Sequence, residues 1–223
     1  SRAFDYYTRS LEISRKLSDQ RSVAHTLNNL GALHYKSGKF DDALDYYSQA
    51  LEVFRELKDS YSLAYSYNNI GRIYTEREEF DQALKLIKSA LDTFQSIDSE
   101  SGKLKSYRAL GYCWYKQDEY AAAIDYYKQA IEILEEIREN LEIEEDRRNF
   151  AAGAHSVYES MVLTLVEDEN TVDAYNYVER SRARSFLDLM GGGKIEIGKS
   201  RHREYIKAAY EKDNPSPLYS SRS

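Results

Sequence analysis

The amino-acid sequence predicts an all-α fold in which antiparallel helix pairs stack into a solenoid. Three segments of the chain align without gaps at a spacing of 40 residues, which indicates an internal repeat. Within each segment the apolar residues recur at the spacing of one helical face. The only two prolines are Pro215 and Pro217, so helix can follow helix through most of the 223 residues without a forced break.

The repeat is defined by four residue positions that share one spacing. The aligned segments begin at Ala24, Ala64 and Leu104. The recurring residues are Gly31, Gly71 and Gly111; Phe40, Phe80 and Tyr120; Ala43, Ala83 and Ala123; and Ala50, Ala90 and Ala130. A common spacing for four residue classes is hard to produce by chance, so each segment is expected to be one structural unit.

Each unit is predicted to hold two helices, here called helix A and helix B. In the first unit Leu27, Leu30, Gly31 and His34 fall on one face of helix A. The glycine is expected to let helix B approach closely, because it has no side chain. Gly38 is expected to form the turn between the two helices.

The same register divides the whole chain. The solenoid is expected over residues 1–190, and it starts with a helix B at 1–17 whose helix A is missing, so we expect the chain to be cut from a longer protein. Full units are expected at 21–57, 61–97 and 101–143, followed by a divergent pair at 146–190. Residues 191–223 are expected to be a linker, with a short polar helix near Ser200–Lys212 and a coil after it.

The helix A segments "LNNLGALH", "YNNIGRIY" and "YRALGYCW" resemble the tetratricopeptide repeat. The period found here is longer than the usual one of that family, and it resembles the repeats of kinesin light chains, spindle-orientation adaptors and many bacterial regulators. This resemblance covers about residues 1–137. It implies a right-handed superhelix that acts as a protein-binding scaffold and not as an enzyme.

The stretch after residue 137 adds a second resemblance. The elements "DRRNF", "VYESMVLTL" and "VERSRARSFLDLM" resemble the junction between tetratricopeptide repeats and a CHAT domain, which is a caspase-like peptidase domain. This resemblance implies that the chain is a regulatory region and that any peptidase activity lies downstream. Two alternatives stay open: a stand-alone adaptor, and a scaffold that forms homo-oligomers through its N-terminal edge.

Residues Gly193–Ser200 match the P-loop pattern G-x-x-x-x-G-K-S, which would indicate nucleotide binding. A P-loop needs a buried strand before the glycines and a helix after the serine, so that backbone amides converge on phosphate. Here the glycines follow a predicted helix, and the sequence after Ser200 is too short to build a core sheet. We therefore interpret Gly191–Gly193 as the end of that helix, and we expect no nucleotide cofactor.

The candidate binding site is the concave surface that helix A residues line in this family. Asparagines can pair with the backbone of an extended peptide, tyrosines add flat apolar contact, and Arg72, Lys105 and Arg108 suit acidic side chains or a terminal carboxylate. The alternative is an ordinary solvated face. The predicted groove residues are His25, Asn28, Asn29, Tyr35, Tyr65, Asn68, Asn69, Arg72, Lys105, Arg108, Tyr112 and Tyr115.

Composition excludes several other functions. The net charge of −7 argues against general affinity for nucleic acid or anionic membranes, and no apolar run approaches the length of a membrane span. The four histidines lack metal-ligand spacing, so no metal is expected. The single cysteine, Cys113, is expected to be a packing residue of a cytoplasmic protein. The basic run Arg180, Arg182 and Arg184 is either a docking patch for a further domain or a solvated helix face.

Overall fold

The computed structural model describes residues 2–140 and 144–189, and its regular structure within these ranges is entirely α-helical. The helices in chain order are α1 (Arg2–Lys16), α2 (Gln20–Lys36), α3 (Phe40–Glu56), α4 (Ser60–Glu76), α5 (Phe80–Ser96), α6 (Glu100–Tyr115), α7 (Tyr120–Glu139), α8 (Glu144–Glu167) and α9 (Thr171–Leu189). The expected linker, the polar helix and the P-loop pattern after residue 189 lie outside the described residues.

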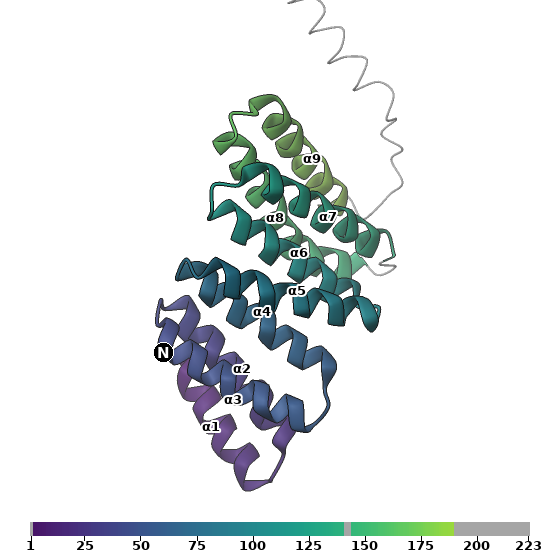
Figure 1. Ribbon diagram of the computed structural model, residues 1–223. Coiled ribbons are helices and arrows are strands. Elements are labelled where there is room, and N and C mark those ends of the chain that lie inside the picture. Colours follow the sequence, from purple (N-terminus) through teal and green to yellow (C-terminus); the bar gives the residue numbers. More distant parts are fainter. Residues whose placement is uncertain (1, 141–143, 190–223) are drawn as a thin grey trace, which may run out of the picture.

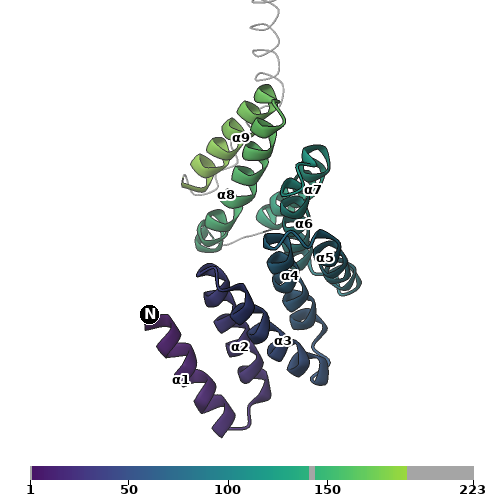
Figure 2. The same cartoon turned by 60° about the vertical axis from the view of Figure 1, so that its left-hand side comes forward.

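The helices stack in chain order from α1 at one end of the array to α9 at the other (Figure 1). Each helix packs against the next one, which forms the antiparallel pairs α2–α3, α4–α5, α6–α7 and α8–α9 behind the single helix α1. The first helices of the pairs also contact one another, α2 with α4, α4 with α6, and α6 with α8. The result is the predicted right-handed superhelix, and the row α2, α4, α6 and α8 forms one side of it (Figure 2).

The repeated glycines act as predicted. A Cβ atom on Gly31 would lie 2.8 Å from the ring of Tyr47, and one on Gly111 would lie 2.7 Å from the ring of Tyr127. At Gly71 the corresponding distance is 2.5 Å, to a side-chain carbon of Ile87. Helix B therefore approaches helix A so closely that a methyl group would force a shift.

Turns between the helices recur twice in each repeat and share one backbone conformation. Positive φ values occur at Ser18, Gly38, Lys58, Glu78, Asp98 and Asp118. The residue after each one donates its backbone N–H to the carbonyl five residues before it, as in Asp59 to Phe54 at 3.0 Å. This pattern closes α1 to α6 and, at Glu169, α8 in the same way, whereas α7 ends at Asn140 with a negative φ. The predicted turn at Gly38 is confirmed, with a φ of 70°.

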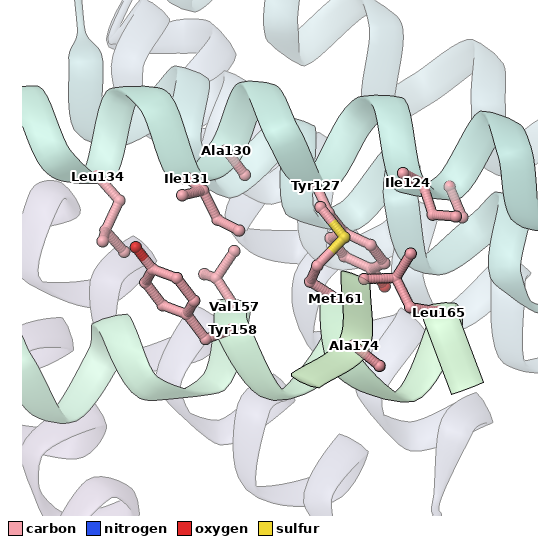
Figure 3. Packing of buried hydrophobic residues seen from close by; sticks show 11 residues of the cluster. Ile124, Tyr127, Ala130, Ile131, Leu134, Val157, Tyr158, Met161, Leu165 and Ala174 are labelled. Carbon is pink, nitrogen blue, oxygen red and sulfur yellow. The ribbon is translucent and has the colours of Figure 1, made fainter. Parts of the chain in front are cut away.

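The fourth pair departs from the 40-residue spacing but keeps the packing. Tyr158, Met161 and Leu165 of α8 are buried, as expected for a helix A face, and Ala174 of α9 is buried at the first small position of helix B. Figure 3 shows this core, in which the side chains of α8 lie against those of α7. The helix α7 is three residues longer than α3 and α5, which have 17 residues each, and it ends at Glu139.

Candidate binding groove on the helix A face

A hollow of about 370 Å³ lies on the face formed by α2, α4, α6 and α8. Each of these four helices contributes at least one side chain to its wall, and α7 contributes one more. The lining residues are Tyr35, Tyr65, Asn68, Asn69, Arg72, Glu76, Lys105, Arg108, Ala109, Tyr112, Tyr127, Ser156 and Ser160. The hollow therefore spans four successive repeats, although the residues that form it are far apart in the sequence.

The structure brings eight of the twelve predicted groove residues to this hollow and places four elsewhere. The eight are Tyr35, Tyr65, Asn68, Asn69, Arg72, Lys105, Arg108 and Tyr112. His25 and Asn29 are exposed on α2 outside the hollow. Tyr115 is half-buried, and its ring stacks on that of Tyr112 with centroids 6.5 Å apart. Asn28 is buried.

Three of the four predicted asparagines connect neighbouring helices, and two of these three, Asn68 and Asn69, also line the hollow. The side-chain amide of Asn69 donates to Oδ1 of Asn28 at 3.2 Å, and that of Asn68 donates to the hydroxyl of Ser106 at 2.8 Å. Asn68 is 4% exposed, and its Oδ1 has no hydrogen-bond partner. These two bonds therefore connect α2 with α4 and α4 with α6.

Three cations surround the hollow. The guanidinium of Arg72 lies over the ring of Tyr35, 4.7 Å from its centroid, and the ammonium of Lys105 lies 4.3 Å from the centroid of Tyr65. Arg108 donates to the hydroxyl of Ser156 on α8 at 3.0 Å. Across the described part of the chain, none of the three cations forms an ion pair with a carboxylate.

The positive charges of Lys105 and Arg108 are disfavoured by burial and by repulsion from neighbouring cations. Burial lowers the pKa of Lys105, and the nearby charge of Arg108 lowers it further. Burial also lowers the pKa of Arg108, with a further contribution from Arg72. The positive charges therefore repel one another where little water screens them, so an anion placed among them would be bound favourably.

Glu76 is the one acidic side chain among the described residues that line the hollow, and two tyrosines donate hydrogen bonds to it. The hydroxyl of Tyr35 donates to Oε1 of Glu76 at 2.8 Å, and the hydroxyl of Tyr112 donates to the same oxygen at 3.0 Å. These bonds connect α2, α4 and α6 through one carboxylate. Burial raises the pKa of both tyrosines, and the neighbouring carboxylate raises it further at Tyr112.

Five lining residues were not among the predicted groove residues, and the sequence carries a signal for two of them. In the register of the fourth pair Ala174 takes the place of Ala43, so Ser156 and Ser160 correspond to His25 and Asn29. Extending the predicted groove to α8 would have found both. No repeat signal marks Glu76, because Lys36 and Lys116 occupy its position in the other repeats. Tyr127 comes from a helix B and Ala109 carries no polar group.

Cys113, possible metal ligands and Arg182 were also considered as functional residues. Cys113 is fully buried, and burial raises the pKa of its thiol, so it is a packing residue. No cluster of potential metal ligands occurs among the residues that the structure describes. Arg182 pairs with Glu179 at 2.8 Å within α9, as in the solvated-face interpretation.

Comparison with known proteins agrees with this geometry. A model of the tetratricopeptide repeat matches residues 2–56 and 62–136. The chain belongs to the tetratricopeptide repeat family. A search of curated protein sequences found no match to this chain. In the described ranges, none of its helices is both long and apolar enough to span a membrane.

Several solved structures share the fold of this tetratricopeptide repeat protein at low identity. BtubC (BKLC) from P. vanneervenii has a TM-score of 0.60 and 18% identity, with 100% of this chain and 96% of that chain covered. Aspartyl phosphate phosphatase F from Bacillus subtilis has a TM-score of 0.68 and 15% identity, and the alignment covers 94% of this chain and 54% of that chain. A structure of kinesin light chain TPR-like repeats of Podosopora anserina has a TM-score of 0.56 and 14% identity, and the alignment covers 81% of this chain and 84% of that chain. These likenesses show the fold alone.

Proposed function

We propose that this tetratricopeptide repeat protein is a non-catalytic scaffold that binds an acidic segment of a partner protein on its helix A face. The observation that carries the proposal is the group of three cations around the hollow, none of which has a carboxylate partner in the described residues. A partner carboxylate, either a side chain or a C-terminus, would relieve the repulsion among them.

The other groups in the wall suit a peptide. The rings of Tyr65 and Tyr112 offer flat apolar contact to the side chains of a bound segment. Binding at this face needs no rearrangement of the solenoid, because each first helix is already bonded to the next one.

The test compares two charge reversals of equal size. Arg72→Glu combined with Lys105→Glu should weaken binding of an acidic, fluorescein-labelled synthetic peptide at least tenfold in an anisotropy titration. Lys85→Glu combined with Lys88→Glu makes the same change at exposed positions of α5 and should leave the affinity within about twofold. Equal binding of a peptide with Asn and Gln in place of Asp and Glu would refute the proposal. Free and amidated C-termini separate a terminal carboxylate from acidic side chains.

The finer role that we propose is regulation of a CHAT-type peptidase in the reducing cytoplasm. It is supported by the resemblance of the segment "VERSRARSFLDLM" to the junction before such domains. Any peptidase activity would then belong to a domain after residue 223. Reading the native coding sequence downstream tests this role, because a CHAT domain requires sheet-forming segments that carry a His and a Cys. If they are absent, the stand-alone adaptor and the homo-oligomerising scaffold are left.

A further inference from the structure

The cations of the hollow on the helix A face are held in place by neutral side chains of neighbouring helices. Nη2 of Arg72 on α4 donates to the hydroxyl of Tyr35 on α2 at 3.4 Å, and the same guanidinium lies over the ring of that tyrosine. The ammonium of Lys105 on α6 lies over the ring of Tyr65 on α4. These contacts fix the two cations at the wall without cancelling their positive charge.

Arg108 brings a third positive charge close to the other two. Its guanidinium donates to the hydroxyl of Ser156 on α8 at 3.0 Å, which is again a neutral group. Burial and the charge of Arg108 lower the pKa of Lys105, and burial and the charge of Arg72 lower the pKa of Arg108. The three charges therefore act on one another across the hollow, so one compact anion can interact with all of them.

The hollow holds an excess of two positive charges. Among the described residues that line it, the three cations contribute +3 and Glu76 contributes −1, which leaves +2. The carboxylate of Glu76 already accepts hydrogen bonds from two tyrosine hydroxyls. A single carboxylate of a ligand would balance only one of the excess charges. A phosphorylated side chain carries about −1.5 to −2 at pH 7 and would balance both.

The hydrogen-bond donors of the cations also match a phosphoryl group. A guanidinium has five N–H donors in a planar fork, and within the described residues Arg72 and Arg108 each form one hydrogen bond. The remaining N–H groups can bond two phosphate oxygens in parallel. Lys105 adds the donors of its ammonium group. A phosphoryl group presents three oxygens to these donors, whereas a carboxylate presents two.

We propose that the acidic segment bound on the helix A face carries a phosphorylated side chain, and that its phosphoryl group lies among Arg72, Lys105 and Arg108. This inference rests on the proposed function, because it names the anion that the same hollow receives. Since neighbouring helices already hold the cations, little ordering of their side chains is needed when the ligand binds. Phosphorylation of the partner would then control its binding to a scaffold whose net charge of −7 otherwise repels acidic segments.

Anisotropy titrations with four matched peptides test this inference. Each is a fluorescein-labelled, amidated peptide of Gly, Ala and Asn whose centre carries phosphoserine, phosphotyrosine, two adjacent aspartates or unmodified serine. At about pH 7.5 the better phosphopeptide should bind about tenfold more tightly than the two-aspartate peptide, because both charges reside on one group. Equal affinities of these peptides would overturn this inference and leave the proposed function in place. If none of the three charged peptides binds more tightly than the serine peptide, both are overturned.

The pH dependence of binding provides a readout that a carboxylate ligand does not share. The second pKa of a phosphorylated side chain is about 6, so acidification from about pH 7.5 to about pH 5.5 should weaken binding of the phosphopeptide several-fold. The aspartates keep their charge, because their ordinary pKa is about 3.9. The same pH dependence for both peptides would overturn the inference.

The two-aspartate peptide also serves as the control for titration within the hollow. Any titration of Glu76 acts on both peptides alike, so the comparison isolates the phosphoryl group. The charged or titratable side chains that line the hollow are Tyr35 from α2; Tyr65, Arg72 and Glu76 from α4; Lys105, Arg108 and Tyr112 from α6; and Tyr127 from α7.

Arg108→Gln tests the position of the phosphoryl group. The new side chain can still donate to Ser156, but the excess charge of the hollow falls from +2 to +1. The preference for the phosphopeptide over the two-aspartate peptide should fall from about tenfold to about twofold. Arg55→Gln removes a charge at an exposed position of α3 and should leave the preference unchanged. An unchanged preference for Arg108→Gln, at unchanged helicity, would place the phosphoryl group outside this hollow and overturn the inference.

Discussion

The carboxylate of Glu135 on α7 lies 2.5 Å from the guanidinium of Arg184 on α9. The hydroxyl of Tyr158 on α8 donates a hydrogen bond to Oε1 of Glu135 at 2.7 Å, and Arg138 donates to the backbone carbonyl of Arg184 at 2.7 Å. One buried acid therefore joins three successive helices where the 40-residue spacing ends. Arg184 is therefore engaged by Glu135 and Arg138 and is not available to dock another domain. Arg180, in contrast, is exposed.

The first prediction concerns the coupling of this pair. Arg184→Met should lower the free energy of unfolding by about 2 kcal/mol, because it leaves a buried carboxylate without its main ion partner. In a Glu135→Gln background the same change should cost much less, which gives a coupling energy of about 1–2 kcal/mol in a urea double-mutant cycle. Arg182→Met is the matched control at an exposed position. If the losses of unfolding free energy in the two single variants add up to that of the double variant, Arg138 or water pairs with Glu135 as well as Arg184 does.

The second prediction concerns a glycine outside the repeat signature. Gly102→Ala should lower the free energy of unfolding by about 1–3 kcal/mol, because the added Cβ would collide with the fully buried ring of Phe94 between the second and third pairs. The neighbouring Ser101→Ala is exposed and should change stability by at most about 0.5 kcal/mol. Chemical denaturation monitored by circular dichroism checks both. A stability of Gly102→Ala equal to that of Ser101→Ala would show that the interface accommodates a methyl group.

Gly102 also shows where prediction of the fold from the sequence ends. Gly31, Gly71 and Gly111 could be recognised because they recur at one spacing within a unit, and the contacts inside a unit repeat with them. Ser22 and Ser62 occupy the position of Gly102 in the other repeats, so the repeat gives no signal for it. The contact arises between units, where the ring of Phe94 requires a glycine in one repeat only.

The third prediction follows from the buried tyrosines. Burial raises the pKa of the fully buried Tyr47, Tyr127 and Tyr158 above the ordinary value of 10.0. Above pH 10 the unfolded chain loses these protons while the folded chain keeps them, so their contribution to stability is present below pH 10 and is lost as the pH rises. Each such tyrosine should remove about 1.4 kcal/mol of unfolding free energy per pH unit above 10.

Urea denaturation between pH 8 and pH 11 checks this pH dependence. Tyr47→Phe removes one buried phenol and should make the loss above pH 10 less steep, even if it changes the stability at pH 8. Tyr6→Phe alters a tyrosine that is 69% exposed, so its slope should equal that of the unaltered chain. An unfolding free energy that stays constant up to pH 11 would contradict the expected linkage.

The groove could be predicted in part for a related physical reason. The positions of Tyr65 and Lys105, and of Arg72 and Tyr112, recur at the repeat spacing and face the same side. The hydrogen bonds between units do not follow from that spacing. They depend on which residues meet between the first helices of neighbouring pairs. Asn68 on α4 bonds to Ser106 on α6, and Tyr35 on α2 bonds to Glu76 on α4. The repeat spacing therefore predicts which residues lie on the helix A face. Which of them remain available to a ligand depends on the side-chain pairs that form between helices.

The last prediction separates stability from binding at Glu76. Glu76→Gln should weaken the bonds from Tyr35 and Tyr112, because a neutral amide oxygen is a poorer acceptor than a carboxylate, and should cost about 1 kcal/mol in a urea denaturation. The same change removes the negative charge from a hollow lined by three cations, so an acidic synthetic peptide should bind about threefold to tenfold more tightly, most strongly at low salt. The exposed substitution Glu78→Gln is the control and should change neither quantity appreciably. Weaker binding by Glu76→Gln would mean that the carboxylate itself contacts the peptide or that the tyrosine bridge sets the shape of the hollow.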